Sequence, residues 1–191
     1  PLHFEIGFGG GEHLSYRADL LPNHGFIGAE PFLNGVAQAL THVEEQRLAN
    51  IRLHAGDALE VLSRVPDGAL TMVYLLHPDP WPKARHAKRR MMNDGPVRMI
   101  ADKLKPGGEF LIETGNLADV DERSQFPFEL GVPDHLTFAG RAHLEGLLDE
   151  AGFEVVTVQE RRVDDLMGAA KNLVKILLGR PGVLSVPYQS K

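Results

Sequence analysis

The first 114 residues alternate between short apolar runs and longer segments in which apolar residues recur every three or four positions. The short runs are bounded by glycine, proline or aspartate, and they predict strands at residues 3–8, 25–30, 51–55, 70–76 and 109–114. The periodic segments predict helices at residues 12–21, 32–48, 59–64 and 94–104. Strands that alternate with helices indicate an α/β fold with a mostly parallel sheet and right-handed crossovers.

Turn and capping residues separate these elements. Asp94 is expected to cap the helix 94–104, with Pro96 in its first turn. Pro106-Gly107-Gly108 predicts a turn before the fifth strand. The alternation of apolar runs and periodic segments stops at residue 115, and residues 115–137 predict a long loop. Residues 140–151 predict a helix. Residues 153–163 and 172–178 predict an antiparallel edge pair of strands, and residues 180–191 form a tail.

The composition is that of one globular domain, which we predict to span residues 1–191. No apolar run is long enough to cross a bilayer, and the absence of cysteine excludes disulfides and thiolate chemistry. We expect a cytoplasmic protein. The chain begins at Pro1 without a methionine, so an N-terminal arm is expected to be missing. The nine histidines have no metal-site spacing and no serine lies in a nucleophile elbow, so we expect no metal and no covalent intermediate.

The stretch from His77 to Arg90 follows the fourth predicted strand and is the most unusual part of the chain. Three prolines between residues 78 and 82 exclude regular structure and hold Asp79 and Trp81 between them. Five cationic residues follow: Lys83, Arg85, Lys88, Arg89 and Arg90. The net charge of −6 argues against a nucleic-acid partner for the whole molecule, but a local basic patch still acts over a Debye length of about 8–10 Å. The stretch therefore suggests a site for a flat base on a phosphate chain, or a solvated surface loop.

Glycines follow the first predicted strand, as in the first half of a nucleotide-binding βαβ unit. A dinucleotide fold would place a third glycine at position 12, where Glu12 instead disfavours a bound pyrophosphate. The alternative pattern is Glu5-x-Gly7-x-Gly9-x-Gly11, which is typical of S-adenosylmethionine methyltransferases. That cofactor carries a sulfonium, an ammonium and a ribose but no phosphate, so a nearby acid is favourable.

Three acids follow three successive predicted strands. Glu5 can attract the positive end of the cofactor, Glu30 can accept both ribose hydroxyls, and Asp57 can reach the adenine amino group. Because the carboxyl ends of parallel strands meet at one edge of a sheet, we expect these acids and Asp79 to converge there. The alternative is that Glu5, Glu30 and Asp57 are helix caps or surface acids.

Long motifs in the chain resemble those of the bacterial tRNA (guanine-N7-)-methyltransferases, over about residues 3–114. The matching stretches are Glu5-Ile6-Gly7-Phe8-Gly9-Gly10-Gly11-Glu12, Phe26-Ile27-Gly28-Ala29-Glu30, Gly56-Asp57-Ala58 and the long, specific Pro78-Asp79-Pro80-Trp81-Pro82-Lys83-Ala84-Arg85-His86-Ala87-Lys88-Arg89-Arg90. The resemblance implies a Rossmann-like class I methyltransferase fold. Its central sheet would have seven mostly parallel strands, one antiparallel strand, and helices on both faces.

The resemblance also implies a role for each matched residue. Glu5, Gly7, Gly9, Gly11, Glu30, Asp57 and Asp79 would bind S-adenosylmethionine, and Asp79 would also be the catalytic acid. The residues implied to bind tRNA are Trp81, Lys83, Arg85, His86, Lys88, Arg89 and Arg90. We also expect a monomer or a weak homodimer that has tRNA but no membrane as a partner.

The C-terminal third departs from this family. Gly115 stands where the family has a substrate-binding Asp, and no Thr-Lys-Phe-Glu motif precedes the last strand. Three functions therefore stay open: methylation of guanine N7 in the tRNA variable loop, methylation of another substrate by a class I methyltransferase, and RNA binding without catalysis.

Overall fold

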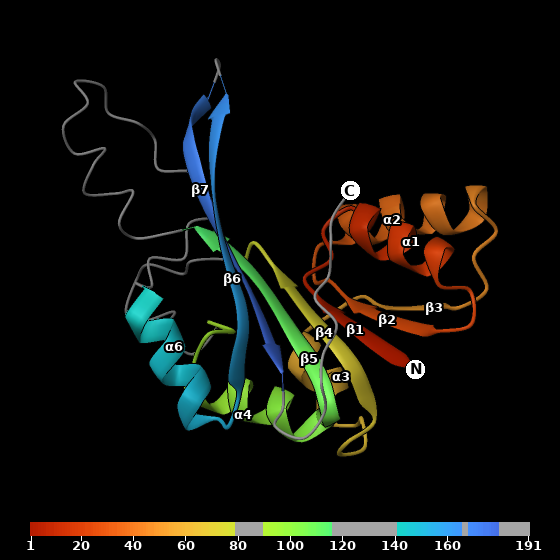
Figure 1. Cartoon of the computed structure of the whole chain (residues 1–191). Coiled ribbons are helices and arrows are strands. Elements are labelled where there is room, and N and C mark those ends of the chain that lie inside the picture. The colour runs from red at the N-terminus through yellow and green to blue at the C-terminus, as the bar shows by residue number, and fades with distance from the viewer. Residues whose placement is uncertain (79–89, 116–140, 166–167, 180–191) are drawn as a thin grey trace.

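The computed structural model describes residues 1–78, 90–115, 141–165 and 168–179, and Figure 1 shows a central sheet with helices on both sides. The sheet has seven strands: β1 (Leu2–Ile6), β2 (Gly25–Ala29), β3 (Ile51–His54), β4 (Leu70–Leu76), β5 (Leu104–Gly115), β6 (Glu154–Asp165) and β7 (Gly168–Gly179). The described helices are α1 (Glu12–Leu20), α2 (Leu33–Glu45), α3 (Ala58–Leu62), α4 (Asp94–Lys103) and α6 (Arg141–Glu150).

The strand order is β3-β2-β1-β4-β5-β7-β6. The pairs β1–β2, β2–β3, β1–β4 and β4–β5 are parallel, whereas β7 runs antiparallel to both β5 and β6. The predicted α/β fold with a mostly parallel sheet is therefore confirmed. The chain runs outward from β1 to β3 and then returns to place β4 on the other side of β1. This reversal creates a switch point between β1 and β4, where ligands of such sheets bind.

The two faces of the sheet have separate apolar cores, because successive strand residues point to opposite sides. On one face, Phe4, Val73 and Phe110 pack with apolar residues of α3, α4 and α6. On the other face, Phe26 and Ile51 pack beneath α1 and α2, which Figure 1 shows together over the first three strands. Helices α3, α4 and α6 thus cover one face of the sheet, and α1 and α2 cover the other.

Several element boundaries differ from the sequence predictions. β1 ends at Ile6, so Gly7 and Phe8 belong to the following turn. Asn93, in an extended conformation, is the N-cap of α4, whereas Asp94 is its first residue and pairs with Arg98 at 2.6 Å. The expected cap at Asp94 is therefore wrong by one position. An acid in the first turn still suits the positive end of the helix.

The predicted turn before the fifth strand is also wrong. β5 begins at Leu104, which pairs with Leu70, and the next pair is Glu109 with Met72. The residues between form an irregularity in the strand, in which Gly107 has φ 73°. The final strands are longer than predicted, since β6 runs to Asp165 and β7 begins at Gly168. β7 lies between β5 and β6, so β6 alone forms that edge of the sheet.

In the described part of the chain, no helix has the length and apolar content needed to span a membrane.

Candidate functional site

The glycine turn between β1 and α1 lies at the carboxyl edge of the sheet. Gly7, Gly9 and Gly11 have φ values of 65°, 56° and 82°, which favour glycine because other residues rarely adopt them. A Cβ atom added to Gly7 or Gly9 would meet nothing within 4 Å, whereas one on Gly11 would lie 2.5 Å from Cβ of Ala39. The turn therefore leaves open space at its first two glycines and packs tightly against α2 at the third.

Glu30 follows β2 and is buried, with 7% of its surface exposed. Its Oε2 accepts a hydrogen bond from Gly9 N at 2.9 Å, and its Oε1 accepts one from Phe32 N at 2.8 Å. The carboxylate thus joins the glycine turn to the start of α2. Each carboxylate oxygen has a second lone pair, so Glu30 can still accept hydroxyl donors from a ligand.

Glu5, near the end of β1, is also buried, with 2% of its surface exposed. Its Oε2 lies 2.7 Å from Nδ1 of His13, the second residue of α1. A buried carboxylate is costly without a hydrogen-bond donor, and His13 supplies one. Glu5 lies two residues before Gly7, and Glu30 bonds to Gly9, so the structure brings both acids to the same glycine turn.

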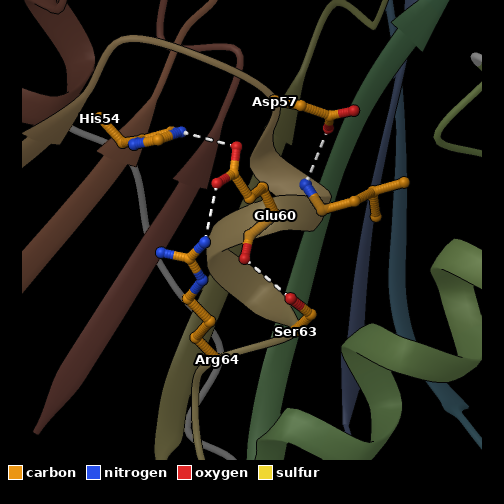
Figure 2. Close-up of polar contacts among 6 residues, drawn as sticks. His54, Asp57, Glu60, Ser63 and Arg64 are labelled. Atoms are coloured by element: carbon orange, nitrogen blue, oxygen red, sulfur yellow. Dashed lines mark hydrogen bonds and ion pairs between the residues drawn. The ribbon is translucent and has the colours of Figure 1, made fainter.

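Asp57 caps a helix, which was one of the two roles that its sequence position allowed. Figure 2 shows its carboxylate at the start of α3, where Oδ1 accepts a hydrogen bond from Leu59 N at 2.9 Å. The side chain is exposed, and the backbone N–H of the preceding Gly56 donates to the Glu30 carbonyl at 3.1 Å. Asp57 is therefore a helix cap at the same edge of the sheet, and its contact with adenine stays a prediction.

The remaining contacts in Figure 2 stabilise the short helix α3. Glu60 Oε1 accepts from Arg64 Nη2 at 2.9 Å, and the Glu60 carbonyl accepts from Ser63 Oγ at 2.8 Å. Nε2 of His54, at the end of β3, lies 3.8 Å from Glu60 Oε2. The exposed pair of Arg64 and Glu60 contributes less than about 1 kcal/mol, so no single contact in this group holds α3 in place.

The stretch that begins after β4 is described only at its two ends. His77 has a φ of 50°, donates its backbone N–H to the Glu113 carbonyl at 2.7 Å, and places Nε2 3.6 Å from Glu113 Oε1. Arg90 is half-buried, and its carbonyl accepts from Asn93 Nδ2 at 3.0 Å. The predicted site residues Asp79, Trp81, Lys83, Arg85, His86, Lys88 and Arg89 lie outside the described residues.

A buried polar layer beneath α1 was not predicted from the sequence. Tyr74 of β4 is buried beside His13, with ring centroids 4.9 Å apart, and its hydroxyl lies 3.1 Å from His3 Nδ1. His3 Nε2 in turn lies 2.8 Å from His24 Nδ1. Burial, reinforced by His24 and Arg17, lowers the pKa of His3 to about 4, and burial raises the pKa of Tyr74. Both side chains are therefore neutral at pH 7.

Sequence reasoning missed Gly35 as well. A Cβ atom there would lie 2.2 Å from the Gly9 carbonyl oxygen, so α2 contacts the backbone of the glycine turn directly. The available signal was a glycine in the first turn of a helix, where it lowers helix propensity without local benefit. Among the described residues, no group of three His, Asp or Glu side chains could hold a metal ion.

Comparisons with known proteins identify the family of the chain. The family model Methyltransf_4, described as "Putative methyltransferase", matches residues 1–133. A tRNA (guanine-N(7)-)-methyltransferase of Erythrobacter litoralis is 86% identical over 114 residues, which are 60% of this chain and 49% of that protein. One of Sphingopyxis alaskensis is 74% identical over 119 residues, covering 60% of this chain and 50% of that protein. The chain spans about half the length of the curated relatives it matches.

Solved structures of low sequence identity share the fold. An S-adenosylmethionine-dependent methyltransferase from Aquifex aeolicus superposes with a TM-score of 0.62 at 14% identity, covering 92% of this chain and 81% of that one. The N-methyltransferase NodS from Bradyrhizobium japonicum, solved with S-adenosyl-L-homocysteine, gives 0.64 at 14% identity, covering 95% and 78%. These matches show a class I methyltransferase fold.

Proposed function

The chain belongs to the Methyltransf_4 family of methyltransferases, and from this premise we propose that it transfers a methyl group from S-adenosylmethionine to N7 of guanine in tRNA. Relatives that are 86% and 74% identical over the matched residues are named tRNA (guanine-N(7)-)-methyltransferases, which supports this substrate. The long motif from Pro78 to Arg90 supports it as well. We expect a cytoplasmic protein that is a monomer or a weak homodimer.

The arrangement of two acids around the glycine turn supports S-adenosylmethionine as the cofactor. Two buried carboxylates, Glu5 and Glu30, flank a glycine turn whose Gly7 and Gly9 face open space. A ligand with cationic groups and a diol fits this arrangement, because carboxylates offer acceptors and negative charge only. A phosphate-bearing cofactor does not fit, since it would meet two buried negative charges. The residues present therefore suit S-adenosylmethionine.

Each acid has a separate task in the proposed site. S-adenosylmethionine supplies a methyl group on a positively charged sulfur. Glu5 orients the cationic end, and burial strengthens that attraction because the local dielectric is low. Glu30 holds the ribose hydroxyls while its two backbone donors keep the carboxylate in one orientation. Asp57 remains the candidate partner of the adenine amino group.

The transfer itself requires little acid–base chemistry. N7 of guanine carries an in-plane lone pair, so the new N–C bond forms as the S–C bond breaks, and no proton leaves N7. The chain therefore acts mainly by aligning the reactants and excluding water. Asp79 would offset the positive charge that develops on the base, and Trp81 would stack on the base or brace its loop. The cationic residues between positions 83 and 90 would bind the tRNA backbone and offset the cost of unstacking the base.

The test is a methyl-transfer assay on unmodified tRNA, with digestion of the product to nucleosides. We expect N7-methylguanosine with the unaltered chain and its loss with Asp79→Ala. A matched control is Asp149→Ala, because Asp149 is exposed on α6. Cofactor turnover without any methylated guanine would reject the tRNA substrate, and a chain that binds no cofactor would reject the whole proposal.

A second candidate is methylation of a different substrate by the same cofactor site. It is favoured by the extent of the curated matches, which cover about 60% of the chain. The residues beyond that match carry no shared substrate motif in the sequence. Methyl transfer to total cellular RNA, protein extract and small molecules in parallel would separate the two candidates, because only one fraction would accept label.

A further inference from the structure

The contact between α1 and the sheet is polar at the point nearest the proposed cofactor site. His13 and Arg17 lie one helical turn apart on α1, and both meet Tyr74 of β4. The His13 ring meets the Tyr74 ring edge-on, with an interplanar angle of 68°, and the Arg17 guanidinium lies 5.9 Å from the Tyr74 ring centroid. His13 and Arg17 are half-buried, and His13 also contacts the buried carboxylate of Glu5, which is costly to bury without a hydrogen-bond donor.

In the hydrogen bond between His13 and Glu5, His13 is the donor. A carboxylate only accepts hydrogen bonds, so Nδ1 of His13 carries the proton and donates across the 2.7 Å contact to Oε2. Among residues in the described segments, this is the hydrogen bond that the Glu5 side chain receives. The other carboxylate oxygen, Oε1, is thereby left for a ligand. The Tyr74 ring packs edge-on against the imidazole on one side, while 32% of the His13 side chain is exposed.

From this geometry, and resting on the proposed cofactor site, we propose that His13 is a positioning residue that holds the Glu5 carboxylate toward the cationic end of S-adenosylmethionine. Without the donor at Nδ1, the buried carboxylate would turn toward another donor or toward water. Tyr74 of β4 contacts His13, and His3 of β1 and Arg17 of α1 contact Tyr74 in turn. None of them gives Glu5 a hydrogen bond, so none replaces His13.

Two substitutions separate hydrogen bonding from packing. His13→Phe keeps the ring and its contact with Tyr74 but removes the donor. His13→Asn removes the ring but keeps an N–H donor at the position of Nδ1. His143→Asn on α6 is the matched control, because His143 is exposed and far from the glycine turn along the chain. Each protein is checked for folding by circular dichroism and thermal melting, and S-adenosylhomocysteine binding is measured by calorimetry.

We expect His13→Phe to raise the Kd for S-adenosylhomocysteine about tenfold or more, as for loss of a hydrogen bond to a charged group. His13→Asn should stay within about threefold of the unaltered chain, and His143→Asn should match it. In a Glu5→Gln background, His13→Phe should change the Kd less than about twofold, because the carboxylate it positions is gone.

Three results would overturn the positioning role: unchanged binding by folded His13→Phe, equal losses in His13→Phe and His13→Asn, or an undiminished loss in the Glu5→Gln background. If His13→Phe does not fold, His13→Asn decides alone, since about a tenfold loss there rejects the role of the donor. Failure of the proposed cofactor site gives a different result, because the unaltered chain would then bind no S-adenosylhomocysteine, whereas a different methyl acceptor would leave these binding results unchanged.

Discussion

Replacing Gly35 by alanine tests whether α2 and the glycine turn are in backbone contact. Gly35 lies in the first turn of α2, and its missing Cβ would be 2.2 Å from the Gly9 carbonyl oxygen and 3.4 Å from Cγ of Glu30. Restoring an ordinary contact requires the helix or the turn to move by about 1 Å, in a region where close packing leaves little slack. Gly9 N also donates to Glu30, so the same shift disturbs the candidate site.

The expected size follows from two opposing terms. Alanine raises helix propensity by about 1 kcal/mol over glycine, whereas overpacking against backbone costs about 1–3 kcal/mol. The matched control is Gly146→Ala in α6, where an added Cβ meets nothing within 4 Å. That variant should gain about 0.5–1 kcal/mol, because it carries the propensity term without the clash. Gly35→Ala should therefore be less stable than Gly146→Ala by about 1–3 kcal/mol.

The assay combines thermal melting with cofactor binding. For a chain of this size, we expect the Tm of Gly35→Ala to fall below that of Gly146→Ala by about 2–10 °C. The Kd of Gly35→Ala for S-adenosylhomocysteine should rise about tenfold or more, because a 1 Å displacement removes the alignment of the turn. Equal stability of the two variants, together with unchanged binding by Gly35→Ala, would refute the contact.

Three further predictions address stability and RNA binding. The pKa of His3 is about 4 in the folded chain and near 6.5 in the unfolded chain, so only the unfolded chain takes up the proton between these values. The free energy of unfolding should therefore fall as the pH drops from 6.5 to 4, by at most about 3 kcal/mol. Urea titrations at several pH values should show a flatter dependence for His3→Gln. Asp57→Ala should lower the free energy of unfolding by about 1 kcal/mol through loss of the α3 cap, and Asp57→Asn should lose less; equal melting of all three proteins would contradict the cap. If the five cations between Lys83 and Arg90 bind phosphates, tRNA affinity should fall on the order of 100-fold from 50 to 200 mM salt, whereas a nearly constant affinity would exclude that role.

Much of the fold could be predicted because its signals are local. The first four strands are covered by helices and form short apolar runs, whereas each helix buries one face and has apolar residues at regular spacing. The start of β5 was mispredicted for a physical reason. Pro106-Gly107-Gly108 has the composition of a turn, but the same residues also suit an irregularity within a strand, and only the pairing of Leu104 with Leu70 distinguishes the two.

Some residues of the candidate site could likewise be predicted from the sequence, whereas others could not. Glu5 and Glu30 could be placed at one edge because parallel strands align their carboxyl ends, and the structure brings both to the glycine turn. An acid between a strand and a helix, such as Asp57, fits a cap and a ligand contact equally well in sequence. His13 and Gly35 were missed because their contacts depend on how α1 and α2 rotate against the sheet. That rotation follows from tertiary packing and leaves no spacing pattern.

The two buried acids are held by different kinds of partner, and this difference bears on how the site would respond to its ligand. Glu30 is fixed by two backbone N–H groups, which no side-chain substitution or protonation removes. Glu5 is held by one imidazole, that of His13, which a single side-chain substitution removes. The ribose end of the proposed site is therefore built into the backbone, while the cationic end depends on a single side chain. Substitutions around α1 should consequently affect recognition of the charged end of the cofactor more than recognition of its sugar.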